Sequence, residues 1–383
     1  MRTFQKDVIA KYLKTYAEPE AALGTRLQCH TEHVLVVPAQ DESISLLEGI
    51  QPALDTVSEQ GQRALCIIVV NATDTHDSLV QKRNTELIHA LRDHGPTVPL
   101  HTQNETPCWH TRASGFDLVV VDRNSTGFRL PSNQGVGLAR KIGCDLALTA
   151  LRDGTNRSPL IHMTDCDVRL PSDYFDVAVP AACAALIYRF SHKSSGHSLI
   201  DDAHAKYEAF LRYYVLGLQH AGSPYAFHTI GSCIAVTPTA YAAVRGVPKR
   251  QAGEDFYLLN KLAKVGQLHT ANSSPVTIQA RTSLRVPFGT GQATNEIVQN
   301  RDPYKIYDPT IFDLMKTWCN ALEAINGTRV NAAYETVLCR AESALDSINQ
   351  QRLRTALEAI GAPDALMTAA AQSSTSTIRQ KWL

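Results

Sequence analysis

Short β-branched runs alternate with helical patterns in the first half of the chain, and this alternation limits the possible folds more than any other feature. Residues 34–37, 65–70 and 118–121 are apolar runs too short for ordinary helices. Their side chains are apolar on both faces, which is typical of strands in a parallel sheet covered by helices. The sequence therefore predicts an α/β fold with a mixed, mostly parallel sheet flanked by helices.

Helical periodicity fills the stretches around these runs. Residues 47–57, 79–91 and 139–150 each place apolar side chains three or four positions apart, which predicts three amphipathic helices. A further apolar run at residues 160–163 predicts another strand. Residues 1–16 repeat large apolar side chains every four positions and predict an N-terminal helix docked on the body.

Three regions follow from this pattern. We expect an N-terminal helical segment over residues 1–30, the α/β domain over residues 31–300 and a C-terminal helical region over residues 301–383. The last boundary is placed where Asp302-Pro303 and Asp308-Pro309 interrupt the chain, because the residue before a proline is disfavoured in a helix.

Composition excludes several classes of protein. Lys and Arg total 37 and Asp and Glu total 37, so the chain lacks the basic excess of a nucleic-acid binder. The longest apolar stretch, residues 177–188, contains Pro180 and is shorter than the roughly 20 residues of a membrane-spanning helix. The N-terminus has no recognisable export signal, and the nine cysteines form no C-x-x-C pair. We expect free thiols and a cytoplasmic protein.

Two carboxylates follow the strand predicted at residues 160–163. Asp165 and Asp167 are two positions apart, so in an extended segment both side chains point to the same face. Oxygen ligands of this kind suit Mg²⁺ or Mn²⁺, which often bridge a few carboxylates to substrate phosphates. A turn or helix-capping pair of carboxylates is the alternative interpretation.

The surrounding motifs give this pair a context. Five occur in order along the chain: VLVVPAQDE at 34–42, NATD at 71–74, GLARKIG at 137–143, DCD at 165–167 and GED at 253–255. With this ordered set the chain resembles family 2 glycosyltransferases of the GT-A (Rossmann-like, nucleotide-diphospho-sugar transferase) fold over about residues 33–270. The distance between the first and fourth motifs indicates an insertion around residues 94–114. Asp41 stands where the family prefers Asn, and Asn71 where it usually has Asp.

The resemblance implies a nucleotide-diphospho-sugar donor whose nucleoside lies at the first two motifs. Pro38, Ala39 and Glu42 would edge the nucleoside pocket. Asn71 and Asp74 would face the base and ribose.

It also implies residues for the diphosphate and the sugar. Arg140 or Lys141 would lie near the nucleotide, since a cation suits a diphosphate. Asp165 would contact the donor ribose or sugar, and Asp167 would hold Mg²⁺ or Mn²⁺ against the diphosphate. In inverting members the Asp of the Glu254-Asp255 pair deprotonates the acceptor hydroxyl.

The remaining features of the resemblance concern the acceptor. The Gln-x-x-Arg-Trp motif of processive synthases and their membrane helices are absent, so transfer to a small or soluble hydroxyl acceptor is expected. Inversion with Asp255 as base is favoured, and retention stays open. His228 is a candidate for the acceptor site and His269 for a second metal ligand, because imidazole suits Mn²⁺.

A segment rich in arginine and glycine follows the last motif. Residues 275–291 have the pattern of strand and loop, and Arg281 and Arg285 lie within it beside hydroxyl residues and glycines. Such a loop suits a donor diphosphate or a charged acceptor. A solvated strand edge followed by a glycine turn explains it equally well.

Two other functions are open at this point. A haloacid-dehalogenase-like phosphatase would use Asp165 as nucleophile and Asp167 as acid and base. A non-catalytic nucleotide-sugar-binding protein would keep the fold without the chemistry. The C-terminal helices either pack on the body or form a homodimer.

Overall fold

The structure is a computed structural model that describes residues 2–152, 158–280, 290–299, 304–323 and 333–359. The chain divides into two compact units, which are treated separately below. The first comprises Met1–His204 and Thr229–Asn300, and the second comprises Ala205–His228 and Arg301–Leu383.

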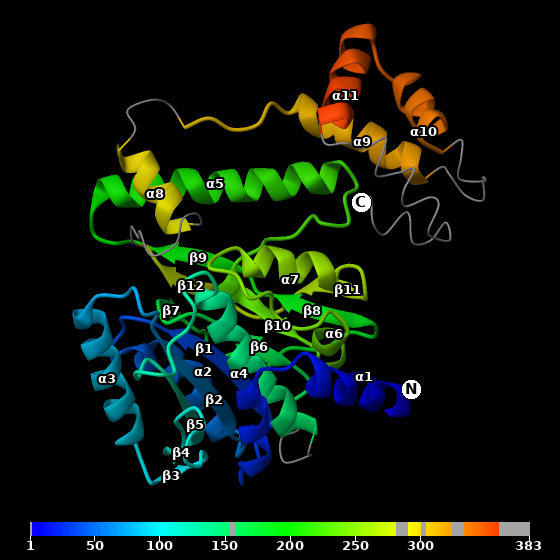
Figure 1. Cartoon of the computed structure of the whole chain (residues 1–383). Helices are drawn as coiled ribbons and strands as arrows, with labels where there is room; N and C mark the ends of the chain where they lie inside the picture. The colour runs from blue at the N-terminus through cyan, green and yellow to red at the C-terminus, as the bar shows by residue number, and fades with distance from the viewer. Residues whose placement is uncertain (1, 153–157, 281–289, 300–303, 324–332, 360–383) are drawn as a thin grey trace. The chain divides into compact units, whose positions relative to one another are not determined.

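A nine-stranded mixed sheet forms the centre of the first unit (Figure 1). Its four central strands run parallel: β6 (Ile161–Met163), β1 (His33–Ala39), β2 (Ala64–Asn71) and β5 (Phe116–Arg123). The side chains of β1 and β2 are almost all buried, as expected for strands covered on both faces. The predicted α/β class and the mixed, mostly parallel sheet are confirmed.

The outer strands complete this sheet and a smaller one. The order across the main sheet is β11-β8-β10-β6-β1-β2-β5-β4-β3. Its outer members are β3 (Thr97–Pro99), β4 (Cys108–Arg112), β8 (Cys183–Ile187), β10 (Ile234–Val236) and β11 (Gln267–Thr270). Three strands make the second sheet: β7 (Val168–Arg169), β12 (Val276–Gln279) and β9 (Phe190–Lys193).

Three long helices connect the parallel strands. They are α2 (Leu46–Glu59), α3 (Ser78–Arg92) and α4 (Gly135–Arg152). Crossovers between parallel strands are right-handed, so α2 and α3, which lead outward from β1 to β5, lie on one face. The helix α4 leads back across the sheet and lies on the other face, in front of the sheet in Figure 1. It approaches closely because Gly143 has no side chain: a Cβ there would lie 2.4 Å from Cγ1 of Val36.

This connectivity creates a switch point beside β1. From β1 the chain moves outward to β2 and β5, and it then returns to β6 on the other side of β1. In open α/β sheets the crevice outside the carboxyl ends of the strands at such a point is the usual ligand site. The amide of Thr164 donates to the carbonyl of Val36 at 3.1 Å, so the segment that follows β6 begins at the carboxyl ends of β1 and β6, where such a crevice is expected.

The first strand is longer than the apolar run at residues 34–37 predicts. β1 continues to Ala39, and Pro38 pairs with Val69 of β2. Proline is tolerated there because β6 pairs with β1 only at Leu35 and Val36. The missing N–H of Pro38 therefore faces the side beyond the end of β6.

Two further segments differ from the sequence prediction. The segment expected to be an insertion, around residues 94–114, contains β3 and β4, which extend the sheet beyond β5. The strand-and-loop prediction for residues 275–291 holds for β12, but α8 (Thr290–Gln299) begins inside that range. Residues 281–289 lie outside the described part of the chain.

Shorter helices cover the rest of the first unit. They are α1 (Arg2–Thr15), the 3-10 helices η1 (Pro19–Arg26) and η2 (Gly231–Cys233), α6 (Pro238–Ala243) and α7 (Glu254–Leu262). The predicted N-terminal helix is thus present as α1, and Tyr12 is its buried anchor.

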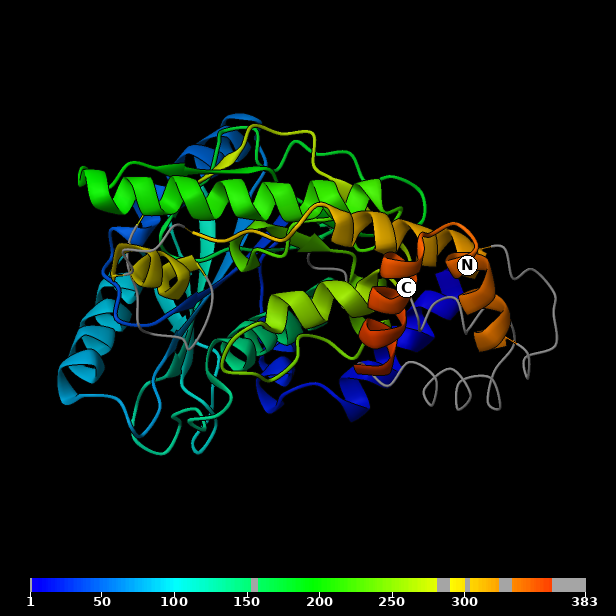
Figure 2. The ribbon, with the colours of Figure 1, turned by 90° about the horizontal axis from the view of Figure 1, so that it is seen from above.

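The second unit is helical in its described part. It contains residues 205–220 of α5 (Ser198–His220), together with α9 (Thr310–Glu323), α10 (Ala333–Glu342) and α11 (Ser347–Ala359). The last three helices lie side by side (Figures 1 and 2). Their shared apolar core consists of Ala321, Leu338, Ala341, Leu353 and Leu357. None of the helices in the described residues has the length and hydropathy needed to cross a membrane.

A buried polar network joins α1, α4 and α6. The Lys141 ammonium donates to Asp145 at 2.8 Å and to the Tyr12 hydroxyl at 2.5 Å. Tyr241 also donates to Asp145, at 2.6 Å. The side chain of Asp145 is fully buried and that of Lys141 is 5% exposed, so each charge depends on the other for compensation.

Replacing Lys141 with Met leaves the Asp145 carboxylate buried without its cation. We expect the free energy of unfolding, measured in urea, to fall by about 3 kcal/mol. The matched control is Lys82→Met, which removes an exposed i,i+4 pair with Glu86 on α3 and is expected to cost less than about 0.5 kcal/mol. Equal effects of the two substitutions would contradict the structural role of the network.

Candidate active site

Acidic side chains from two distant segments meet at a single buried arginine. The guanidinium of Arg140 on α4 donates one hydrogen bond to Asp165 and another to Glu254. Arg140 is 2% exposed. Asp165 follows β6 at the switch point and Glu254 begins α7, so Arg140 fixes the start of α7 beside the crevice.

Gly137, at the start of α4, lets the segment that precedes α7 pack closely against α4. A Cβ on Gly137 would lie 2.5 Å from the carbonyl oxygen of Pro248, and the Gly137 amide donates to the carbonyl of Arg250 at 3.0 Å. Residues 248–250 therefore lie directly against the first turn of α4. Gly253, at a φ of 71°, then turns the chain into α7.

A second glycine completes the surroundings of Arg140. A Cβ on Gly231 would lie 2.9 Å from Nη1 of Arg140, so only glycine leaves room for the guanidinium. The Gly231 amide also donates to the Asp255 carboxylate. The Thr164 hydroxyl donates to the carbonyl of Ser232 at 3.0 Å, which holds η2 against the end of β6.

Three carboxylates share the charge of one guanidinium. Burial raises the pKa of Glu254 to about 7 and also raises the pKa of Asp255, although Arg140 opposes both shifts. Burial works against the charge of Arg140, but Asp165, Glu254 and Asp255 outweigh it and raise the pKa of Arg140. When all three acids are ionised, their three negative charges exceed the single positive charge of Arg140, and burial opposes that state.

The three acids differ in their access to solvent. The side chain of Glu254 is 5% exposed and that of Asp165 is 36% exposed. Asp255 is half-buried, and one of its carboxylate oxygens accepts from the amide of Phe256 at 2.7 Å. Glu254 is therefore placed to hold Arg140, while Asp165 and Asp255 remain within reach of a ligand.

The loop after β6 lies beside the end of β1. The Cys166 thiol donates to the carbonyl of Pro38 at 3.4 Å. The carbonyl of Asp167 accepts from the Gln279 amide at 2.8 Å, and the Asp167 residue is half-buried. The backbone of the Asp165–Asp167 motif is thus fixed between β1 and β12.

Asn71, predicted to face a base, instead ties two strand ends together. It is 3% exposed, and its amide donates to the carbonyl of Ala39 at 3.0 Å. Asn84 of α3 donates in turn to the carbonyl of Asn71 at 2.9 Å. These contacts assign Asn71 a positioning role at the ends of β1 and β2.

The other residues predicted near the nucleoside lie at the same edge. Pro38 and Ala39 are buried in β1, and Glu42 is half-buried just beyond its end. Asp74 is 83% exposed, 3.4 Å from the guanidinium of Arg129. Asp41 has a φ of 60°, a conformation that Asn and Asp adopt more readily than most residues.

Two predicted site residues, the cation Lys141 and the metal ligand His269, are not part of the carboxylate cluster around Arg140. Lys141 belongs to the buried network with Asp145 rather than to the crevice. His269 lies on β11, three strands from β6.

Three predicted residues remain. His228 belongs to the second unit, where burial lowers its pKa. Arg281 and Arg285 lie outside the described residues.

Several residues at this edge escaped sequence reasoning. Gly231 contacts Arg140 and Asp255, and its only signal is a glycine shortly before a strand. His76 accepts from the Thr73 amide at 2.7 Å and bonds Gln40 at 3.1 Å, which joins the loops after β1 and β2. Burial lowers the pKa of His76.

No model of a known protein family matches this chain, and no curated protein matches its sequence.

The raised pKa of Glu254 gives a pH dependence of defined sign. Because the folded pKa lies above the ordinary value of 4.5, at about 7, the protonated acid favours the folded state. This contribution is complete below about pH 4.5 and is lost as the pH rises through 7. In the wild type this group makes the free energy of unfolding fall between about pH 4.5 and 7. We expect that fall to be about 1–3 kcal/mol smaller in Glu254→Gln.

Urea unfolding of the wild type and Glu254→Gln across this pH range measures the difference. Glu59→Gln is the control, because Glu59 ends α2 in an exposed position. Parallel pH profiles for wild type and Glu254→Gln would show that Glu254 has an ordinary pKa.

Proposed function

We propose that the first unit has the GT-A fold and is a metal-dependent glycosyltransferase, which moves a sugar from a nucleotide-diphosphate donor to an acceptor hydroxyl. The observation that carries this proposal is the meeting of Asp165 with Glu254 and Asp255 around Arg140, at the switch point of the sheet. The ordered motifs that resemble family 2 glycosyltransferases coincide with this edge.

The donor set fits a hard divalent cation. Its available ligands are carboxylate oxygens, which suit Mg²⁺ or Mn²⁺, and such ions are commonly held by one or two carboxylates together with substrate phosphates. When ionised, the three acids also carry more negative charge than Arg140 offsets. Asp167, with Asp165, would hold the ion. The bound ion would supply Lewis-acid stabilisation of the diphosphate leaving group.

Two residues of the chain have the remaining proposed roles, Asp255 as the general base and Arg140 as a positioning residue. Asp255 is half-buried with a raised pKa, which brings a carboxylate nearer to the working pH of a general base. It would take the proton of the acceptor hydroxyl as the oxygen attacks the sugar. Both Nη atoms of Arg140 bind carboxylates, so Arg140 positions the acids rather than the diphosphate.

Donor binding is tested by thermal unfolding with a panel of nucleoside diphosphates and Mn²⁺. We expect one base to be favoured and the stabilisation to require the metal, since a ligand at 100 times its Kd adds about 2.7 kcal/mol. Asp167→Asn should lose the metal-dependent part. Asp93→Asn, at the exposed end of α3, should retain it. A panel without any shift would refute the donor assignment.

The base is tested by turnover. Asp255→Asn is expected to lower kcat by about 10²-fold or more, because the amide cannot accept the proton. Binding of the nucleoside diphosphate should be preserved, since the substitution leaves Asp165 and Asp167 intact. If kcat is unchanged, another base or a retaining mechanism operates.

A further inference from the structure

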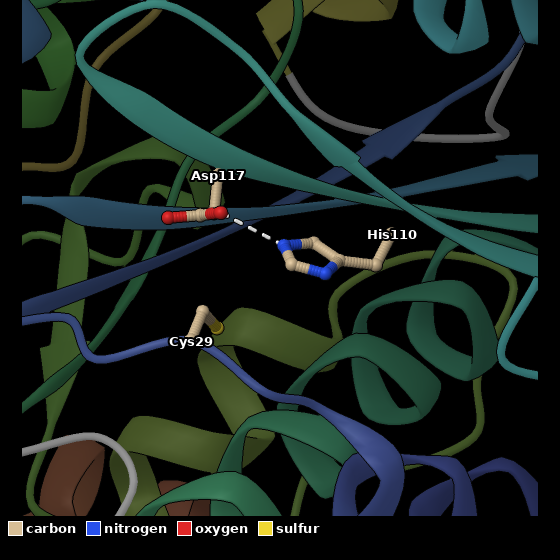
Figure 3. A group of neighbouring side chains, drawn as sticks. All are labelled: Cys29, His110 and Asp117. Carbon is tan, nitrogen blue, oxygen red and sulfur yellow. Dashed lines mark hydrogen bonds and ion pairs between the residues drawn. The ribbon is translucent and has the colours of Figure 1, made fainter. Parts of the chain in front are cut away.

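A second cluster of chemically reactive side chains lies away from the crevice. Within the residues that the structure describes, Cys29, His110 and Asp117 are the one group of histidine, cysteine and acidic side chains whose ligand atoms all lie within 4.8 Å of one another (Figure 3). Their exposed fractions are 7%, 8% and 1%. His110 and Asp117 come from the adjacent strands β4 and β5, whereas Cys29 lies far from both in sequence, so the fold brings Cys29 to the other two.

The cluster occupies the opposite edge of the sheet. Asp117 is the second residue of β5, near the amino end of a parallel strand, whereas the crevice lies at the carboxyl ends. His110 is on β4, which pairs with β5. Cys29 lies in the irregular segment between η1 and β1 and closes the group from outside the sheet.

The hydrogen bonds around Asp117 leave the group suited to a metal. Oδ1 of Asp117 faces Nε2 of His110 at 2.8 Å. The other oxygen, Oδ2, accepts from Nε of Arg63 at 2.8 Å, and Arg63 is itself held by the carbonyl of Phe116 at 2.8 Å. Carboxylates that bind metals are commonly held by an outer hydrogen bond, as Arg63 holds Asp117 here.

We propose that Cys29, His110 and Asp117 bind a zinc ion. One sulfur, one imidazole nitrogen and one carboxylate oxygen are the ligands that zinc takes in proteins, and three protein ligands with a fourth position for water form a usual zinc set. Binding would release the thiol proton of Cys29 to solvent and form the zinc–sulfur bond. Two anionic ligands then balance the charge of Zn²⁺.

The tetrahedral geometry requires a small rearrangement. Metal–ligand bonds of about 2.0–2.3 Å place neighbouring ligand atoms roughly 3.3–3.8 Å apart. The three atoms lie within 4.8 Å of one another, and the His110–Asp117 pair, now hydrogen-bonded at 2.8 Å, would separate to admit the ion. The Cys29 segment lacks regular secondary structure and moves more readily than β4 or β5. Zinc would therefore fasten this segment to the sheet.

A nucleophilic Cys-His-Asp triad is the competing interpretation, and burial argues against it. All three side chains are enclosed, so a substrate bond has no access to the sulfur.

The test uses the purified full chain, stripped of metal and titrated with Co²⁺ alone. We expect one cobalt ion per chain with a thiolate-to-cobalt charge-transfer band, and an equivalent zinc ion measured by mass spectrometry after exposure to Zn²⁺. The band should disappear in Cys29→Ser. It should also weaken in His110→Asn, which decides the question if Cys29→Ser does not fold.

The matched control is Cys108→Ser. Cys108 is buried on the same strand and two positions before His110, hence on the same face, but it is not in the cluster. Its variant should keep the band. The proposal is overturned if the wild type shows no thiolate band, if the band persists in Cys29→Ser, as it would with cobalt on Cys166, or if Cys108→Ser loses it equally.

Discussion

A buried guanidinium must be compensated, and Arg140 imposes this constraint on the candidate site. Its partners come from the loop after β6 and from the first turn of α7, so the compensation fixes both segments at the same edge of the sheet. The cost of enclosing a charge is large unless it is paired and hydrogen-bonded. When the acids are ionised, the same pairing leaves surplus negative charge beside the crevice, and this surplus links the fold to the proposed metal chemistry.

Much of the central sheet was predictable because its strands are apolar on both faces. Residues 34–37, 65–70 and 118–121 all lie within parallel strands, and the pattern needs no tertiary information. The resemblance in motif order also led to Asp165 and Glu254, which the structure joins through Arg140. β3 and β4 were missed because short strands with mixed composition lack a distinctive period.

Side-chain roles within the site depended on geometry that the sequence does not encode locally. Arg140 and Lys141 are adjacent in sequence, but successive residues of a helix point about 100° apart. One therefore faces Asp165 and the other faces Asp145. Asn71 bonds backbone carbonyls because two strand ends meet there. Cys29, His110 and Asp117 have no motif spacing, so their meeting follows from tertiary structure alone.

The central claim is that Asp165 and Asp167, at the edge of the sheet where Arg140 holds the acids, form a divalent-cation site for a nucleotide donor. Anomalous diffraction from crystals grown with Mn²⁺ and the nucleoside diphosphate that stabilises the protein most tests it directly. The account predicts a manganese peak coordinated by Asp165 or Asp167 and by the diphosphate, with Asp255 facing the same cavity. Manganese bound only at another place, or a nucleotide away from the carboxyl ends of β1 and β6, would contradict it.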